Sequence, residues 1–369
     1  ADTSVTASIT PKALTVTGAS AVSRVYDGTT AATLAGGVLD GLVSGETLTL
    51  SGLSGAYATK TAGSGKAVTV TGATLADNTG GLASNYTVSN PTSVTGNVTK
   101  ASISSVSGLS ASDKTYDGST AVVIGGKAVI TGMVVGDDLA FSSASSAFSD
   151  QNAGTGKTVN ISGITLTGND LANYNFTNTS ATATASIARK ALTVIGATAA
   201  NRVYDGSMAA TISGGSLDGL VGKETLTLTS MTGLFADKNV GTAKAVTVSG
   251  AALTGGANGG LASNYTVTDL TGLTANITKA TISTVSNIVA DSKVYDANTK
   301  ATVSATGATF NGMVSGDSLS LSATNAAFAD KNAGVAKTVA VTGIALGGTD
   351  AVNYNLSSST GSGSGAITP

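Results

Sequence analysis

The chain contains no cysteine, no histidine and no tryptophan. Without cysteine and histidine it lacks thiol nucleophiles, the usual zinc ligands and the histidine of the common catalytic triads. Small secreted domains often rely on disulfides for stability. Because none can form here, any folded unit of this chain must be stable without disulfides.

Charged residues are also scarce, at 11% of the chain, and 19 basic residues nearly balance 21 acidic ones. The net charge of -2 and the lack of a basic stripe do not favour nucleic acid as a partner, because such binding depends on neutralising phosphates. No apolar run approaches the roughly eighteen residues that a membrane-spanning helix needs. The sequence therefore predicts no nucleic-acid partner and no membrane span.

Glycine is abundant, with 48 residues, whereas proline occurs only three times. Threonine, serine, valine and alanine make up much of the rest, a composition typical of half-buried strands joined by glycine turns. Apolar and polar residues alternate in short runs such as Leu48-Thr49-Leu50 and Val68-Thr69-Val70. An alternation of period two predicts strands with one buried face, so the chain is predicted to be all-β.

A tyrosine-aspartate step recurs four times, at intervals of 90, 88 and 91 residues. The third position is glycine in three copies and alanine in the fourth: Tyr26-Asp27-Gly28, Tyr116-Asp117-Gly118, Tyr204-Asp205-Gly206 and Tyr295-Asp296-Ala297. An asparagine-tyrosine step keeps a similar period: Asn85-Tyr86, Asn173-Tyr174, Asn264-Tyr265 and Asn353-Tyr354. A fixed long period predicts a tandem array of one domain.

The recurring isoleucine or valine at the end of each copy places the domains at residues 1–98, 99–187, 188–277 and 278–369. Copies one and three match each other best, as do copies two and four, which indicates duplication of a pair. Ile367-Thr368-Pro369 repeats Ile9-Thr10-Pro11. We therefore expect the array to be part of a longer one.

Each copy of about 90 residues holds some seven short strands bounded by glycine, aspartate or asparagine, which predicts a small antiparallel sandwich of immunoglobulin-like type. A stacked β-solenoid is the structural alternative, but it requires a period near 20 to 30 residues, and none occurs. Segments such as 181–194 and 276–282 show no flexible spacer, and each is predicted to continue as one strand from domain to domain. Four sandwiches of roughly 35 to 45 Å would then form a stiff, elongated rod of about 150 Å.

The tyrosines of both motifs are interpreted as anchors of four small cores. In Tyr-Asp-Gly the aspartate is expected to accept a backbone hydrogen bond in an Asx turn, and the glycine to supply a positive φ. The alternative is a ladder of exposed Tyr-Asp pairs that bind a ligand. The change to Ala297 in the fourth copy favours the structural interpretation of these residues.

Acidic residues also repeat with the domain, at Glu46, Asp137, Glu224 and Asp317. They follow glycines beside predicted turns, where carboxylates cap free backbone N–H groups, and a reaction centre repeated in every domain is uncommon. No catalytic residue, cofactor-binding residue or metal ligand is therefore assigned, and no enzymatic activity is expected. Calcium needs six or more oxygen ligands; the alternative of a calcium site would place it near Asp77, Asp170 and Asp350.

Taken together, the [Lys/Arg]-x-Tyr-Asp-Gly step, the Gly-Leu-Val-x-Gly-Glu step at residues 41–46, the Asp-Lys-Asn-Ala-Gly turn and the late Asn-Tyr resemble the YDG-type repeat, close to the mostly bacterial immunoglobulin-like repeats. The resemblance covers residues 9–367. Such repeats look like those of large filamentous-haemagglutinin-like adhesins of Gram-negative bacteria, many of which are exported by two-partner secretion. The third copy matches the turn as Asp237-Lys238-Asn239, whereas the first copy lacks its aspartate.

This resemblance implies an extracellular stalk at the bacterial cell surface, acting in attachment, aggregation or biofilm formation. The expected partners are the neighbouring repeats of the same polypeptide. The alternative is a repeated carbohydrate-binding module that engages glycan, exopolysaccharide or a host surface by avidity.

Overall fold

The computed structural model describes residues 4–304 and 306–369. It is all-β, with 56% strand and 3% helix, arranged as four tandem repeats. The chain divides into two compact units. The first runs to Ala188 without Tyr116–Gly118, and the second comprises Tyr116–Gly118 and Arg189–Pro369.

In the first repeat, a five-stranded sheet of order β3-β12-β9-β8-β4 lies beside a three-stranded sheet β11-β1-β6 and the pairs β10-β7 and β2-β5. The elements are β1 (Lys12–Thr17), β2 (Ser20–Ala21), β3 (Arg24–Val25), β4 (Ala31–Ala32), β5 (Leu34–Ala35), β6 (Val38–Asp40), β7 (Leu48–Ser51), β8 (Ser54–Tyr57), β9 (Gly63–Thr71), β10 (Thr74–Asp77), the 3-10 helix η1 (Ala83–Asn85), β11 (Tyr86–Val88) and β12 (Thr95–Thr99).

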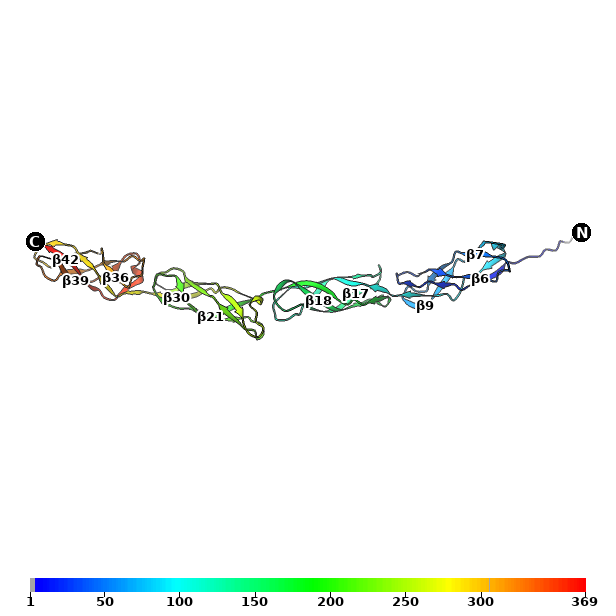
Figure 1. The fold of residues 1–369 in the computed structure, drawn as a ribbon, viewed down its shortest axis with the longest axis horizontal. Coiled ribbons are helices and arrows are strands. Elements are labelled where there is room, and N and C mark those ends of the chain that lie inside the picture. Colours follow the sequence, from blue (N-terminus) through cyan, green and yellow to red (C-terminus); the bar gives the residue numbers. More distant parts are fainter. Residues whose placement is uncertain (1–3, 305) are drawn as a thin grey trace. The chain divides into compact units, whose positions relative to one another are not determined.

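The second repeat has fewer and longer strands, and its main sheet has the order β15-β20-β18-β17. Its elements are β13 (Ala101–Ile103), β14 (Ser105–Ala111), β15 (Lys114–Thr115), β16 (Ile124–Thr131), β17 (Ala140–Phe148), β18 (Gly154–Thr167), η2 (Leu171–Asn173), β19 (Tyr174–Phe176) and β20 (Ala181–Ala188). Strands β17 and β18 run side by side over much of this repeat (Figure 1).

The third repeat reproduces the first, with a five-stranded sheet β22-β30-β27-β26-β23 and a three-stranded sheet β24-β21-β29. Its elements are β21 (Lys190–Ala199), β22 (Arg202–Val203), β23 (Ala209–Ala210), β24 (Ile212–Asp218), β25 (Leu226–Thr229), β26 (Thr232–Phe235), β27 (Gly241–Ser249), β28 (Ala252–Gly255), η3 (Ala262–Asn264), β29 (Tyr265–Val267) and β30 (Leu273–Thr278).

The fourth repeat is built around β42, which pairs with β33, β34 and β39. Its elements are β31 (Ala280–Ile282), β32 (Thr284–Ser286), β33 (Ile288–Ala290), β34 (Lys293–Val294), β35 (Val303–Ser304), β36 (Thr309–Asn311), β37 (Ser320–Ser322), β38 (Asn325–Phe328), β39 (Gly334–Thr342), β40 (Ala345–Gly347), η4 (Ala351–Asn353), β41 (Tyr354–Leu356) and β42 (Thr360–Thr368).

Two expectations about the strands are wrong. In the described residues the four repeats hold twelve, eight, ten and twelve strands rather than about seven each. The sheets are also not purely antiparallel, because two parallel pairs recur in each repeat. The first strand pairs with the strand of the late tyrosine, as in β1 with β11, and the strand before Tyr-Asp pairs with the last strand, as in β3 with β12. Turn residues predict hairpins, but they carry no information on parallel pairing between distant strands.

Each strand buries one face, as the alternation predicts. In β1 the side chains of Leu14 and Val16 are buried while their neighbours are exposed. The prediction of four separate cores is wrong for the third and fourth repeats. One continuous cluster of buried residues reaches from Tyr204 and Phe235 in the third repeat to Tyr354 and Ile367 in the fourth.

The connections between repeats are short, but the predicted uninterrupted strands are broken. Lys279 separates β30 from β31, and Arg189 separates β20 from β21. Among the described residues, no helix is long and apolar enough to cross a membrane.

Candidate functional site

The tyrosine of Tyr-Asp-Gly contacts the following repeat. In the first unit, the Tyr26 hydroxyl donates a hydrogen bond of 3.0 Å to Asp137, a residue of the second repeat. The Tyr26 ring meets the Tyr174 ring edge to face, with centroids 5.6 Å apart. Tyr174 also donates to Asp137, at 2.6 Å. Two tyrosines from neighbouring repeats therefore share one carboxylate, an arrangement we call the tyrosine–carboxylate junction.

The second unit contains the same arrangement between its two repeats. Tyr204 donates to Asp317 at 2.8 Å and Tyr354 donates to it at 2.6 Å, with the two rings 5.5 Å apart. Tyr116, which also belongs to this unit, donates to Glu224 at 2.6 Å and packs edge to face on Tyr265. Edge-to-face tyrosine pairs contribute about 0.5–1.5 kcal/mol beyond their burial.

A lysine completes the junction in two of these places. Lys60 lies 3.0 Å from Asp137 and 3.4 Å from Asp170, and Lys238 contacts Asp317 and Asp350 at 3.0 and 3.5 Å. The side chains of Asp137 and Asp317 are only 2% exposed. Each buried carboxylate therefore accepts from two phenols and pairs with one ammonium group, which satisfies it without a metal ion.

These contacts displace the pKa values of the groups involved. Burial and the hydrogen bond to Asp137 raise the pKa of Tyr174 to about 12, and burial and Asp317 raise the pKa of Tyr354 to about 12. Burial acts to raise the pKa of Asp137, but the hydrogen bonds from Tyr174, Lys60 and Tyr26 outweigh it and lower that pKa. The ionised carboxylate with neutral phenols is thus the favoured state at neutral pH.

The late asparagine is the second contact across the junction. The Asn173 side-chain oxygen accepts a hydrogen bond of 2.9 Å from the Ala62 amide of the first repeat, and Asn353 accepts one from Val240 at the same distance. Both asparagines are buried, and so is Asn264. The Asn173-Tyr174 and Asn353-Tyr354 steps therefore each present both side chains to the preceding repeat.

The aspartate and glycine of the motif form the turn that presents the tyrosine. Asp27 accepts from the Thr29 amide, Asp205 from the Ser207 amide and Asp296 from the Asn298 amide, which is the Asx-turn geometry. The third position has a positive φ in every copy, at Gly28, Gly118, Gly206 and Ala297. Asp117 occupies the same place in the second copy, between Tyr116 and Gly118.

Close packing against the next repeat is a second reason for glycine at the third position of the motif. A Cβ on Gly28 would lie 2.9 Å from a methyl carbon of Val134 in the next repeat. A Cβ on Gly206 would lie 2.8 Å from Val314 in the same way. The turn therefore lies directly against the following repeat, and only a residue without a side chain fits without displacing the valine.

The basic residue two positions before the tyrosine acts within its own repeat. Arg24 lies over the Tyr57 ring at 5.4 Å and pairs with Asp27. Arg202 and Lys293 make the corresponding contacts with Phe235 and Phe328. The guanidinium and the backbone amide of Thr29 together hold the Asp27 pKa at about 2, the amide contributing most.

Sequence reasoning missed the partners of the tyrosines. The expectation that Asp137 and Asp317 cap backbone N–H groups is wrong. Both carboxylates instead accept hydrogen bonds from tyrosine hydroxyls. A signal was present in the spacing, because the acid lies 40, 37, 41 and 37 residues before the late tyrosine to which it bonds. A spacing of 37 to 41 residues in all four copies indicates that the same contact is repeated in each of them.

The acids considered for calcium have other partners. Asp77 accepts from the Ala83 amide, Asp170 from Asp138 and Asp350 from Ser318. In the described part of the chain, no three acidic residues gather closely enough to hold a metal ion.

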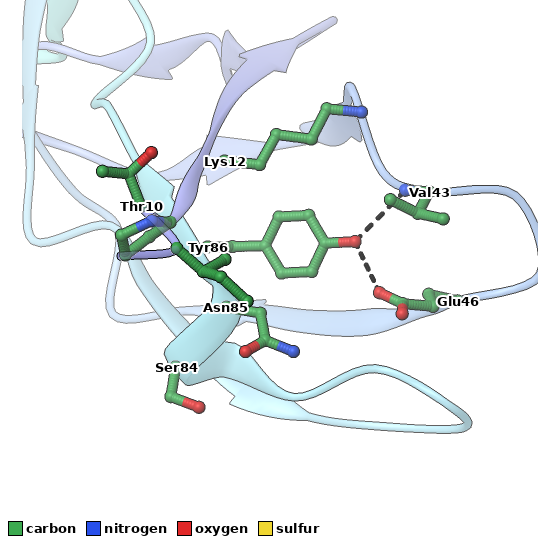
Figure 2. Close-up of a pocket in the computed structure, with 9 residues that line it drawn as sticks. Thr10, Lys12, Val43, Glu46, Ser84, Asn85 and Tyr86 are labelled. Atoms are coloured by element: carbon green, nitrogen blue, oxygen red, sulfur yellow. Dashed lines mark hydrogen bonds between the residues drawn. The ribbon is translucent and has the colours of Figure 1, made fainter. Parts of the chain in front are cut away.

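The fourth copy's Tyr295 and the first copy's Asn85 and Tyr86 differ from their counterparts in the other copies. Tyr295 of the fourth copy is 46% exposed, whereas Tyr26 is 3% exposed. In the first copy the late tyrosine, Tyr86, bonds Glu46 and the Val43 amide at the wall of an open pocket (Figure 2). Asn85 beside it is exposed, unlike its three counterparts.

A family model for the YDG domain matches four consecutive segments, at residues 10–94, 99–183, 188–272 and 278–361. The chain belongs to the YDG-domain family. A search of curated proteins gave no match. Within this YDG array, the residues of the family motif are thus placed at the tyrosine–carboxylate junctions, whereas Tyr295 is exposed and Tyr86 lines a pocket.

Proposed function

We propose that this YDG array is a structural stalk segment of a secreted or surface-attached bacterial adhesin, giving reach and rigidity for cell attachment, aggregation or biofilm formation. The observation that carries the proposal is the tyrosine–carboxylate junction. Within each unit, its buried phenols, carboxylate and asparagine tie the repeats together by directional hydrogen bonds rather than by a flexible linker. Such contacts fix orientation, which is what a spacer requires.

The same proposal includes the finer architecture. Each repeat is an immunoglobulin-like sandwich, and the repeats follow one another as an elongated rod. The burial of one face of each strand supports the sandwich, and the short connections support the rod. Small-angle scattering of the purified chain tests the shape: an elongated profile near 150 Å is expected from the strand lengths, and a profile of a compact particle contradicts it.

The burial of the tyrosines favours a stalk over repeated carbohydrate binding. Sugar rings stack on exposed aromatic faces, yet eight of the nine tyrosines are buried, and Tyr295 alone among them is exposed. The side chains of Asn173 and Asn353 likewise face the preceding repeat. A repeated glycan site would need a shared exposed patch that these residues do not provide.

Spin-label distance measurement tests rigidity inside the first unit. Because the chain has no cysteine, labels at Val38→Cys and Val129→Cys, both exposed positions in successive repeats, would be the only thiol adducts. We expect one narrow distance distribution that broadens in a Tyr26→Ala background. Tyr295→Ala is the matched control and should leave the distribution unchanged. A broad distribution in the otherwise unaltered chain would refute the stalk.

A further inference from the structure

Three pairs of tyrosine rings lie in edge-to-face contact, and both hydroxyls of each pair donate to one carboxylate over 2.6–3.0 Å. The ring centroids are 5.3–5.6 Å apart in the three pairs, which are Tyr26 with Tyr174, Tyr116 with Tyr265, and Tyr204 with Tyr354. The ring carbons ortho to the two hydroxyls therefore lie near the same carboxylate. Holding two reactive groups in contact makes their coupling an effectively unimolecular step.

Tyrosine is the side chain in this protein that loses a single electron most readily. Tryptophan and cysteine, the other common one-electron donors, are absent, whereas nine tyrosines are present. Electron transfer requires no direct contact between the oxidant and the ring, so the burial of Tyr26 and Tyr174 does not prevent it. Burial instead shields the resulting radicals from reaction with solutes and with other chains.

The shared carboxylate is a proton acceptor for either phenol of a pair. An oxidised phenol is a strong acid, and it passes its proton to a base within hydrogen-bond distance. Asp137 accepts from Tyr26 at 3.0 Å and from Tyr174 at 2.6 Å. Lys60 contacts the same carboxylate and is 40% exposed, so Asp137 lies beside a side chain that solvent reaches. Each proton can thus leave Asp137 before the next one arrives.

Tyr57 provides a contrast within the same chain. It is as buried as the paired tyrosines, at 2% exposed, but its hydroxyl donates to the backbone carbonyls of Val22 and Asn97, each at 3.4 Å. Among the residues that the structure describes, no second tyrosine ring packs on it. Tyr57 therefore lacks both the coupling partner and the carboxylate.

We propose that each tyrosine–carboxylate junction is a site of oxidative cross-linking, at which the two tyrosines join as dityrosine. Two equivalents of a one-electron oxidant remove one electron from each phenol, and the two protons pass through the carboxylate to solvent. The two phenoxyl radicals form a carbon–carbon bond between their ortho positions, and the ortho hydrogens then move to the oxygens and restore both phenols. The product has lost two hydrogen atoms and joins two repeats covalently. This goes beyond the proposed stalk, which requires only the hydrogen bonds of the junction.

The test oxidises the dilute, folded chain with photogenerated tris(bipyridine)ruthenium(III), a soluble one-electron oxidant. Dityrosine is detected by its fluorescence, and the linked peptides are identified by proteolysis and mass spectrometry. We expect three links within one chain, each with the loss of two hydrogen atoms: Tyr26 to Tyr174, Tyr116 to Tyr265, and Tyr204 to Tyr354.

Matched variants separate the junction from general oxidation. Tyr26→Phe keeps a ring at this position and should remove the link to Tyr174 alone, whereas Tyr57→Phe should leave all three links. Asp137→Asn removes the proton acceptor and should lower the yield of the Tyr26 link at least about tenfold. The link of Tyr204, formed in the same molecule on its own carboxylate, is the internal reference. If exchange at the Ala62 amide shows that Asp137→Asn opens the junction, the two phenylalanine variants decide the test.

The proposal is overturned if the same links form equally well in the denatured chain, or if Tyr57 is linked as often as Tyr26. It also fails if most of the product joins separate chains through Tyr295, which is 46% exposed. Narrow spin-label distances in a chain that yields no linked peptides would refute cross-linking and leave the stalk intact. A broad distance distribution together with the three links would have the opposite meaning.

Discussion

Removing a single hydroxyl should loosen the junction of the first unit. Tyr26→Phe keeps the ring that packs on Tyr174 and removes only the 3.0 Å hydrogen bond to Asp137. Hydrogen bonds to charged groups contribute about 1.5–3 kcal/mol. Asp137 retains the shorter bond from Tyr174 and the contact with Lys60. We therefore expect a loss at the lower end of this range, about 1.5 kcal/mol.

Hydrogen exchange provides a reporter specific to this contact. The Ala62 amide donates to the Asn173 side chain of the next repeat, so its protection depends on the junction being closed. A loss of about 1.4 kcal/mol corresponds to a tenfold change in an opening equilibrium. Exchange at Ala62 should therefore accelerate about tenfold in Tyr26→Phe, while amides inside β9 keep their rates.

The fourth repeat supplies the matched control. Tyr295→Phe changes the same motif position, but this tyrosine is 46% exposed. In this variant, the free energy of opening measured at each amide should change by less than about 0.5 kcal/mol. If Tyr26→Phe proves as silent at Ala62 as Tyr295→Phe, the hydroxyl does not hold the junction and the reasoning fails.

Three further predictions concern the same junctions. Asn173→Ala leaves the Ala62 amide without its acceptor, and it should lower the free energy of unfolding by about 1–3 kcal/mol, measured by denaturation. Asn85 is exposed, so Asn85→Ala should leave that free energy unchanged. Equal effects of the two substitutions would contradict a contact role for Asn173. Gly28→Ala should destabilise the chain more than Gly45→Ala. Both positions have a positive φ, so alanine adds strain of about 1–2 kcal/mol at either one, but only at Gly28 does a valine lie within 3 Å of the new Cβ. Equal melting temperatures of the two variants would remove the steric argument. The pKa values of Asp137 and Asp317 are lower in the folded chain than in the unfolded chain. Their contribution to folding stability is therefore complete above the unfolded-state carboxyl pKa, and it is lost as the pH falls through the folded-state pKa. Protection of Ala62 and Val240 should thus persist at pH 5 and decline below about pH 4, and an unchanged profile down to pH 2 would exclude ionised carboxylates from the junction.

Much of the local structure was predictable from residue types. Alternating apolar and polar residues predict strands with one buried face, and Asp27-Gly28 predicts an Asx turn with a positive φ, since both effects depend on neighbours in the chain. The fixed interval of the Tyr-Asp step likewise predicts four copies of one domain. These features follow from short-range sterics and hydrogen bonding, and composition and spacing report them directly.

The partner of each tyrosine was decided only by the tertiary structure. Tyr26 bonds Asp137, 111 residues away, rather than Glu46 in its own repeat. A periodic sequence gives the same spacing pattern for a contact within a repeat and for one displaced by a whole period, so the pattern cannot distinguish a separate core from a junction. The parallel pairing of β1 with β11 escapes local reasoning for the related reason that no turn joins these strands. Only the folded chain, with Tyr26 buried and Tyr295 exposed, resolves that ambiguity.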